Sequence, residues 1–185
     1  HSIRRRQRQM CIRDRVCLCT PVRSMTSLLQ ELGGFEGVLT DAGSVKRPLI
    51  DAVSEHCPHM MPQLVPGHPI AGSERHGVMA ASPELFLNHK VILTPSEMSN
   101  SEAVKRIQTM WAVMGADVIE MAADHHDAVL AQTSHLPHLL AYTLVNVLAG
   151  FGDGREVFDY AAGGFRDFSR IAASDPEMWR DIFLS

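Results

Sequence analysis

The chain has 185 residues, which suits one ordinary domain or one domain with part of another. Apolar residues make up 45% of it and the formal net charge is only -4, so the chain can build a core and shows no general affinity for nucleic acid. Its longest mostly apolar stretch, residues 136–151, is interrupted by polar residues and falls short of the ~20 residues that span a bilayer, so we expect no membrane segment.

The first fifteen residues, HSIRRRQRQMCIRDR, are arginine-rich and show neither strand nor helix patterning. A basic arm for RNA and a transit peptide are possible functional interpretations. A disordered or non-native leader is favoured, because an isolated run of charge is usually solvated.

Short apolar runs alternate with amphipathic segments between residues 16 and 122. The apolar runs predict buried strands at Val16–Cys19, Gly37–Asp41, Gln63–Val65, Val91–Thr94 and Asp117–Met121. The amphipathic segments predict helices at Met25–Leu32, Lys46–Cys57 and Glu102–Met114. Strands that alternate with helices indicate an α/β domain with a largely parallel sheet covered on both faces.

After residue 122 the pattern becomes helical only. Asp124 and Asp127 resemble an N-cap pair at the start of a long apolar helix that runs roughly to residue 148. A glycine-rich loop and two further helical pieces follow, and Asp175-Pro176 is a favourable start for the last of them. We therefore expect a domain boundary near residue 122, with residues 123–185 forming a helical domain.

Three segments lie at the predicted carboxyl ends of strands, where doubly wound sheets bind ligands. They are Thr20-Pro21-Val22, Asp41-Ala42-Gly43-Ser44 and Gly67-His68-Pro69. Ser44 and His68 are thus expected in a crevice where a cofactor and a substrate meet. Pro69 holds residue 68 extended, and a histidine there can accept a proton near neutral pH. A structural loop histidine explains His68 equally well from these residues alone.

The helical region offers two pairs of polar residues spaced by four. Ser134 and His138 share one helix face with a kinking proline between them, and they predict either a ligand-lining pair or a satisfied buried pair. Arg166 and Arg170 could grip a dicarboxylate, because arginine binds carboxylate bidentately. For the arginine pair alone, a solvated basic face partnered by Asp167 is the favoured interpretation.

The cysteines and histidines indicate neither a disulfide framework nor a metal site. The chain is too large to need disulfides and has no C-x-x-C pair. We therefore expect a cytoplasmic protein with reduced thiols at Cys11, Cys17, Cys19 and Cys57. No H-E-x-x-H or similar ligand spacing occurs, so we expect no metal at the histidine-rich segment that contains His125, His126, Asp127, His135 and His138.

Four motifs, TDAGSVK, GHPIAGSE, SHLPH and GGFRDFSRIAASDPEMW, together resemble the prephenate dehydrogenase family, which includes cyclohexadienyl and arogenate dehydrogenases. They occur in the family's order, and the resemblance runs from Val16 to Ser185. It implies oxidative decarboxylation of prephenate to 4-hydroxyphenylpyruvate in tyrosine biosynthesis, with hydride transfer to NAD or NADP. It also implies the C-terminal half of a Rossmann-type doubly wound sheet followed by a truncated all-helical domain.

The resemblance implies roles for single residues. His68 would be the catalytic base for the C4 hydroxyl of the substrate, and Ser44 would orient that hydroxyl and the nicotinamide. Arg170 would bind a substrate carboxylate. The remaining substrate residues would be Ser134, His138, Gly163, Glu74, Asp167 and Trp179, and the cofactor contacts would be Thr20, Pro21, Val22 and Ser44.

The chain also departs from the family pattern, because no G-x-G-x-x-G phosphate loop is present. We expect that loop upstream of Val16 and further dimer-building helices after Ser185, in a homodimeric parent. By itself the chain is expected to be inactive with NAD. The alternatives are arogenate as the substrate and a non-catalytic fragment that retains the substrate pocket. A β-hydroxyacid dehydrogenase is disfavoured, since no lysine lies between His125 and Ser185.

Overall fold

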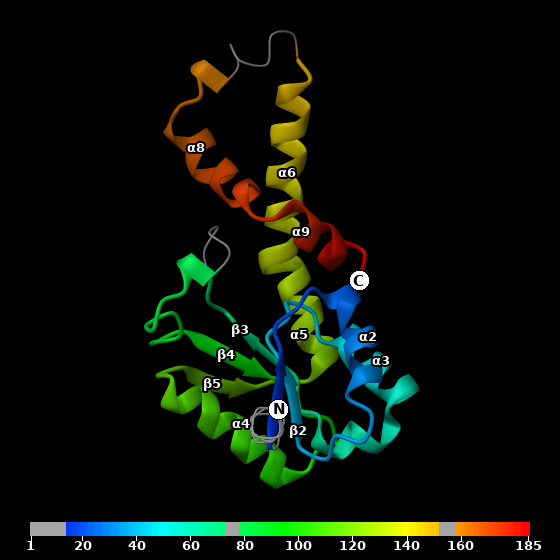
Figure 1. Ribbon diagram of the computed structural model, residues 1–185. Coiled ribbons are helices and arrows are strands. Elements are labelled where there is room, and N and C mark those ends of the chain that lie inside the picture. The colour runs from blue at the N-terminus through cyan, green and yellow to red at the C-terminus, as the bar shows by residue number, and fades with distance from the viewer. Residues whose placement is uncertain (1–13, 73–77, 152–157) are drawn as a thin grey trace, which may run out of the picture. The chain divides into compact units, whose positions relative to one another are not determined.

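The computed structural model describes residues 14–72, 78–151 and 158–185 (Figure 1). The chain divides into two compact units. Among the described residues, 14–72 and 82–127 form the first, called the α/β unit, and 78–81, 128–151 and 158–185 form the second, called the helical unit. No helix in the described part of the chain is long and apolar enough to cross a membrane.

The α/β unit is built on short strands of both directions. Its described strands are β1 (Arg15–Leu18), β2 (Val38–Asp41), β3 (Gly67–Pro69), β4 (Lys90–Leu93) and β5 (Asp117–Glu120). The pairs β1–β2 and β4–β5 are parallel, as the alternating pattern predicts, but β3 runs antiparallel to β4. A parallel bridge between Leu39 and Leu64 joins the two groups of strands.

The predicted strand at Gln63–Val65 is reduced to a single parallel bridge at Leu64, and the paired strand β3 begins two residues after Val65. The Val65 amide donates to the Leu39 carbonyl (2.9 Å), which places residue 65 against β2. Pro66 has no N–H to continue that ladder, and its carbonyl instead accepts from the Thr94 amide (2.9 Å). The chain thereby passes from β2 to β4, and His68 lies inside a strand, opposite Ile92, rather than in a loop after one.

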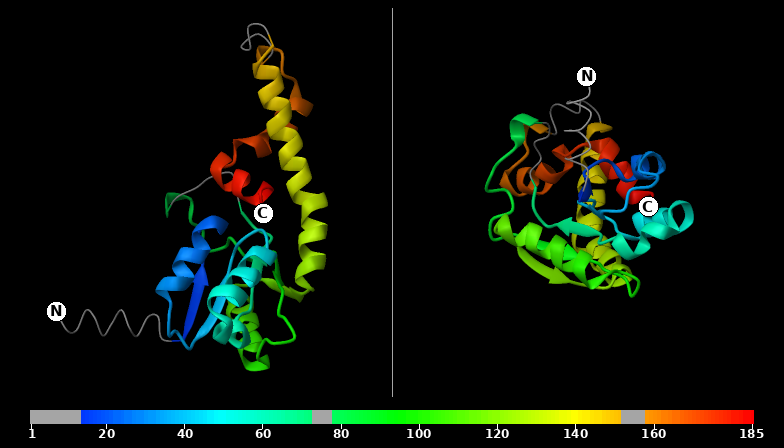
Figure 2. Two further views of the ribbon diagram at one scale, coloured as in Figure 1. Left: turned by 90° about the vertical axis from the view of Figure 1, so that its right-hand side faces the viewer. Right: turned by 60° about the horizontal axis from the view of Figure 1, so that its bottom comes forward.

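Helices cover both faces of the sheet, as predicted. Helices α2 (Val22–Glu31) and α3 (Arg47–His56) lie side by side on one face (Figure 2), and α4 (Ser101–Val113) covers the other. Neighbouring residues of β2 divide between the two faces, as strand geometry requires. Leu39 joins the core under α2 and α3, whereas Val38 joins the core under α4. This is the doubly wound arrangement of a Rossmann-type domain.

The helical unit contains the predicted long helix and the two further helical pieces. From Ala123 the elements are α5 (Ala123–Leu130), whose first turns belong to the α/β unit, η3 (Ala131–His135), α6 (Leu136–Ala149), α8 (Gly163–Ser169), η4 (Arg170–Ala173) and α9 (Pro176–Phe183). Two 3-10 turns, η1 (Pro58–Gln63) and η2 (Val78–Ala80), complete the described elements. The Asp175 carboxylate caps α9 by accepting from the amides of Glu177 (2.8 Å) and Met178 (3.0 Å), which confirms the predicted start.

The kink or break expected at Pro137 takes the form of a wider turn. Residues 131–135 form one stretch of π-helix, and α6 begins directly after it. Proline lacks an amide hydrogen and crowds the carbonyl four residues earlier, so a widened turn is where it fits without ending the helix. The helix therefore continues from α5 into α6 with Pro137 in its first turn.

Candidate functional site

His68 lies buried in β3, and its side chain meets a second histidine. Its Nδ1 is 2.9 Å from Nε2 of His126, which comes from α5, and the two rings meet edge to face with 5.1 Å between centroids. The His126 side chain is completely buried. The two histidines are 58 positions apart in the chain, and both belong to the α/β unit.

The contacts continue from His126 to a carboxylate. Nδ1 of His126 is 2.7 Å from Oδ1 of Asp127, which also accepts the backbone N–H of Lys46 (2.9 Å). Oδ2 of Asp127 accepts the backbone N–H of Arg47 (2.9 Å) at the start of α3. Burial opposes ionisation of Asp127, but the hydrogen bonds from His126 and the two amides outweigh it and hold the pKa of this carboxyl below its ordinary value. Asp127 is therefore a carboxylate surrounded by donors.

A buried ion pair fixes the start of β3. Nζ of Lys46 contacts Oδ2 of Asp41 (2.5 Å) and the carbonyl oxygen of Gly67 (2.6 Å), and both charged side chains are fully buried. Burial lowers the pKa of the Lys46 ammonium, while Asp41 favours its charged form. Asp41 also accepts the amides of Gly67 (3.0 Å) and Gly43 (2.9 Å). These bonds tie the end of β2 to the residue before His68.

The residues predicted to contact a cofactor lie at the carboxyl ends of the parallel strands β1 and β2. Thr20 and Pro21 are exposed in the short connection between β1 and α2, and Val22, half-buried, is the first residue of α2. Ser44 is half-buried in the loop between β2 and α3. The connection after β1 leads into the N-terminus of α2, beside the parallel strand β2. Connections in this position bind parts of dinucleotides in doubly wound sheets, so these residues fit the cofactor that the sequence implies.

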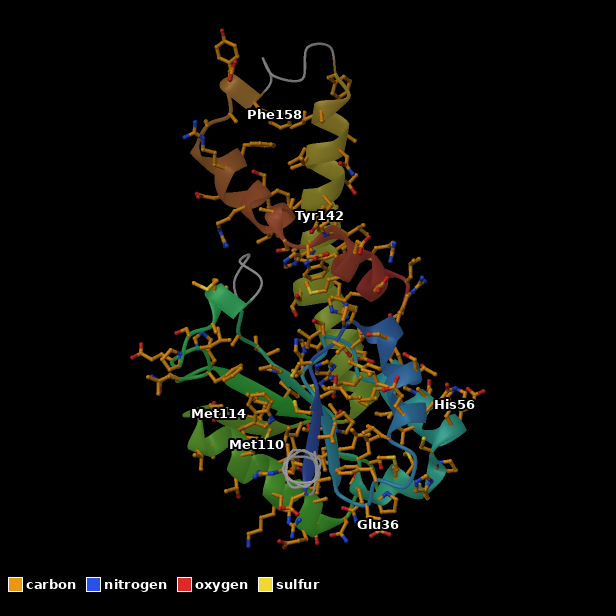
Figure 3. The ribbon with its side chains drawn as sticks, in the orientation of Figure 1. Glu36, His56, Met110, Met114, Tyr142 and Phe158 are labelled. Carbon is orange, nitrogen blue, oxygen red and sulfur yellow. The ribbon has the colours of Figure 1, made fainter. Side chains whose placement is uncertain are left out.

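In the helical unit, two of the predicted residues are stacked on one another. The His138 ring of α6 lies over the Trp179 indole of α9, with 3.7 Å between centroids and 18° between planes. Nδ1 of His138 is 2.9 Å from the carbonyl oxygen of Ser134, so His138 contacts the backbone of Ser134 rather than its hydroxyl. The buried Trp179 indole N–H has no hydrogen-bond partner among the described residues. Tyr142, labelled on α6 in Figure 3, donates its hydroxyl to the Ser174 carbonyl (2.6 Å) and ties α6 to the start of α9.

Three further predicted residues lie along α8 and η4. Gly163 opens α8 with open space where a β-carbon would stand, Asp167 is exposed within α8, and Arg170 is exposed at the first position of η4. Glu74 lies outside the described residues. The structure thus brings His138 and Trp179 together in the helical unit, while His68 and Ser44 belong to the α/β unit.

Sequence reasoning misses Lys46, Asp41, His126 and Asp127 as parts of the site. Asp41 and Lys46 stand within TDAGSVK, and two charges beside a buried strand are the available signal. At the level of sequence the histidine-rich stretch is weighed only as a metal site, and no metal is expected there, so His126 and Asp127 receive no other role. The described residues include no group of three or more histidine, cysteine or acidic side chains that could hold a metal ion.

Comparison with known proteins covers nearly the whole chain. Residues 4–120 match the family model described as "Prephenate dehydrogenase, nucleotide-binding domain", and residues 122–185 match "Prephenate dehydrogenase, dimerization domain". The first match begins inside the stretch that the sequence pattern marks as a leader, and the two matches meet close to the predicted boundary at residue 122.

Curated relatives and solved structures agree with these matches. The chain is 40% identical over 176 residues to the cyclohexadienyl dehydrogenase of Zymomonas mobilis (92% of this chain, 59% of the relative) and 39% identical over 174 residues to the prephenate dehydrogenase of Bacillus subtilis (91% and 47%). It matches the structure of prephenate dehydrogenase from A. aeolicus in complex with hydroxyphenyl propionate and NAD+ with a TM-score of 0.84 and 39% identity (92% and 60%). The match to Synechocystis arogenate dehydrogenase has a TM-score of 0.73 and 28% identity (92% and 62%).

The chain spans about half to three fifths of the length of these relatives. Within that span, family-model matches account for both the α/β part and the helical part. The chain therefore belongs to the prephenate dehydrogenase family.

Proposed function

We propose that the protein carrying this chain converts prephenate to 4-hydroxyphenylpyruvate and carbon dioxide with NAD as the oxidant, in tyrosine biosynthesis in the cytoplasm. The observation that carries the proposal is the buried His68 of the motif GHPIAGSE, held at 2.9 Å from a second histidine. A buried, oriented imidazole is what proton removal from a substrate hydroxyl needs near neutral pH.

His68 has a defined task in this reaction. When bound, NAD supplies the acceptor for the hydride that leaves ring carbon C4. Loss of that hydride leaves a protonated carbonyl unless the hydroxyl proton is removed in step, and His68 takes that proton. The bond from the ring to its carboxylate then breaks, carbon dioxide leaves, and the electron pair makes the ring aromatic. His68 returns its proton to the C4 oxygen, so the base is regenerated and the phenol is neutral.

The other roles are proposals of the same kind. Ser44 orients the hydroxyl and the nicotinamide, and Arg170 binds a carboxylate of the dianionic substrate, since guanidinium groups grip carboxylates bidentately. The pocket residues are Ser134, His138, Gly163, Glu74, Asp167 and Trp179, and the cofactor contacts are Thr20, Pro21, Val22 and Ser44. The match to a dimerization domain supports a homodimer.

Arogenate is a second possible substrate, because the chain is similar to an arogenate dehydrogenase as well. The two substrates differ only in a keto or amino group on the side chain. Rates of reduced-cofactor formation, measured with each substrate and with NAD or NADP, separate the alternatives. We expect prephenate with NAD to give the highest kcat/KM, and oxidation of neither substrate would overturn the proposed function.

Replacing Arg170 by alanine in the complete protein is expected to raise the KM for prephenate. The loss of binding free energy for prephenate should be about 2–4 kcal/mol, because a charge-assisted pair with a substrate carboxylate is removed. Arg166→Ala is the matched control, since Arg166 is an exposed arginine one helical turn earlier. Steady-state kinetics of both variants provide the measurement, and equal KM values for Arg170→Ala and the wild-type protein would leave Arg170 a surface residue.

A further inference from the structure

Three side chains of the α/β unit form a line of short contacts. His68 Nδ1 meets His126 Nε2 at 2.9 Å, and His126 Nδ1 meets Asp127 Oδ1 at 2.7 Å. Both ring nitrogens of the fully buried His126 therefore lie at hydrogen-bonding distance from another side chain. The Asp127 carboxylate, at one end of this line, determines which ring nitrogens of the two histidines carry protons.

Asp127 can only accept. Its two oxygens take the backbone amides of Lys46 and Arg47, which have no alternative to donating. The same surroundings keep the carboxyl ionised, with its pKa below the ordinary value. His126 must therefore donate to Asp127 from Nδ1. In its neutral form His126 then has a lone pair on Nε2 and accepts there, which is the form that the following proposal assigns to it.

We propose that His126 and Asp127 are positioning residues that hold neutral His68 with its proton on Nδ1 and its lone pair on Nε2. This inference rests on the proposed function, in which His68 removes a proton from the substrate. It assigns the atom that does so, Nε2, and it explains why the base starts the reaction able to accept. Neither His126 nor Asp127 needs to touch the substrate.

The same line of contacts stabilises His68 after proton transfer. When Nε2 of His68 gains the substrate proton, the ring becomes a cation, and its Nδ1–H bond to His126 becomes charge-assisted and stronger. His126 is in turn polarised by the Asp127 carboxylate at 2.7 Å. At metal sites, groups that orient a ligating histidine typically contribute about 10–100-fold to activity, and we expect an effect of that order from Asp127.

The spectrum of the wild-type protein tests the proton positions directly. Protein labelled with ¹⁵N in histidine distinguishes protonated from bare ring nitrogens, and His68→Asn and His126→Gln assign the signals. At neutral pH we expect Nδ1–H and a bare Nε2 for both His68 and His126. A doubly protonated His126, or a His68 with its proton on Nε2, overturns the proposal.

Asp127→Asn tests the consequence for activity. The Lys46 and Arg47 amides compete for the single amide oxygen of asparagine, so its NH₂ group is directed at His126 Nδ1 and reverses the tautomers along the line. We expect kcat for prephenate to fall by about 10–100-fold with KM values for prephenate and NAD within a few-fold. Asp124→Asn is the matched control, because it removes the same charge from an exposed site on the same helix. A kcat equal to that of Asp124→Asn overturns the proposal.

A second pair of variants covers the case in which Asp127→Asn does not fold. Glutamine at position 126 retains an oxygen that can accept from His68 Nδ1, whereas leucine fills the space without an acceptor. His126→Gln is expected to keep a several-fold higher kcat than His126→Leu, and equal values contradict the role of His126. If the wild-type protein does not oxidise prephenate, the proposed function fails, while the nitrogen spectrum still decides the tautomer.

Discussion

Replacing His68 by asparagine in the complete protein is expected to lower the turnover of prephenate by about 10²–10⁴-fold, the usual contribution of general-base catalysis. Asparagine keeps a polar group of similar reach, so substrate binding should stay within a few-fold. The physical reason for the loss is that hydride departure then leaves a protonated carbonyl with no group to take the proton.

The pH profile of this variant separates a base from a structural histidine. Wild-type activity should rise with pH through one ionisation, because only the neutral imidazole accepts a proton. That acidic limb should be absent from His68→Asn. His125→Asn is the control, since His125 is an exposed histidine beside His126. If His68→Asn keeps near-normal turnover and the same acidic limb, the proposed mechanism must be abandoned.

Replacing Lys46 by alanine is expected to lower the free energy of unfolding by about 3–5 kcal/mol, the usual cost of breaking a buried ion pair from one side. The variant leaves the fully buried Asp41 carboxylate without its cation and the Gly67 carbonyl without its donor. Because these groups join β2 to β3, the loss falls on the segment that positions His68. Urea unfolding of the wild-type protein and the variant measures the difference.

Two further variants test whether the ion pair is the cause. Arg47→Ala removes the neighbouring cation, whose ion pairs with Asp51 and Asp124 are exposed, and should cost less than about 1 kcal/mol. The double variant Lys46→Met with Asp41→Asn removes both charges and should recover much of the stability, because no buried charge is left uncompensated. If Lys46→Ala costs no more than Arg47→Ala, the buried pair does not stabilise this unit.

Most of the fold can be predicted from local pattern, and the exception lies at the site. The predicted strands at Val16–Cys19, Val91–Thr94 and Asp117–Met121 form within a residue of the expected places. Short apolar runs between turn residues are typical of buried strands. Gln63–Val65 is an equally good apolar run. It forms only one bridge to β2, because Pro66 has no N–H to continue the pairing. The chain then pairs with β4 instead, and the sequence pattern does not reveal which strand will be the partner.

The contacts around His68 are beyond local reasoning for a similar reason. The sequence pattern makes Asp127 a cap of its own helix, but its carboxylate instead accepts the amides at the start of α3, about 80 positions earlier. The same pattern makes Lys46 the first residue of a helix, a position where lysine is usually solvated, yet its side chain is fully buried. Only the packing of α5 against α3 and β3 gives these residues their roles.

The stoichiometry of the reaction tests the central claim most directly. The complete protein is incubated with prephenate and NAD, and NADH, carbon dioxide and 4-hydroxyphenylpyruvate are measured in the same sample. Oxidative decarboxylation predicts one of each per prephenate consumed, at a rate ordinary for enzymes, with His68→Asn slower by about 10²–10⁴-fold. Prephenate that stays intact, or NADH formed without a matching amount of carbon dioxide, would contradict the account.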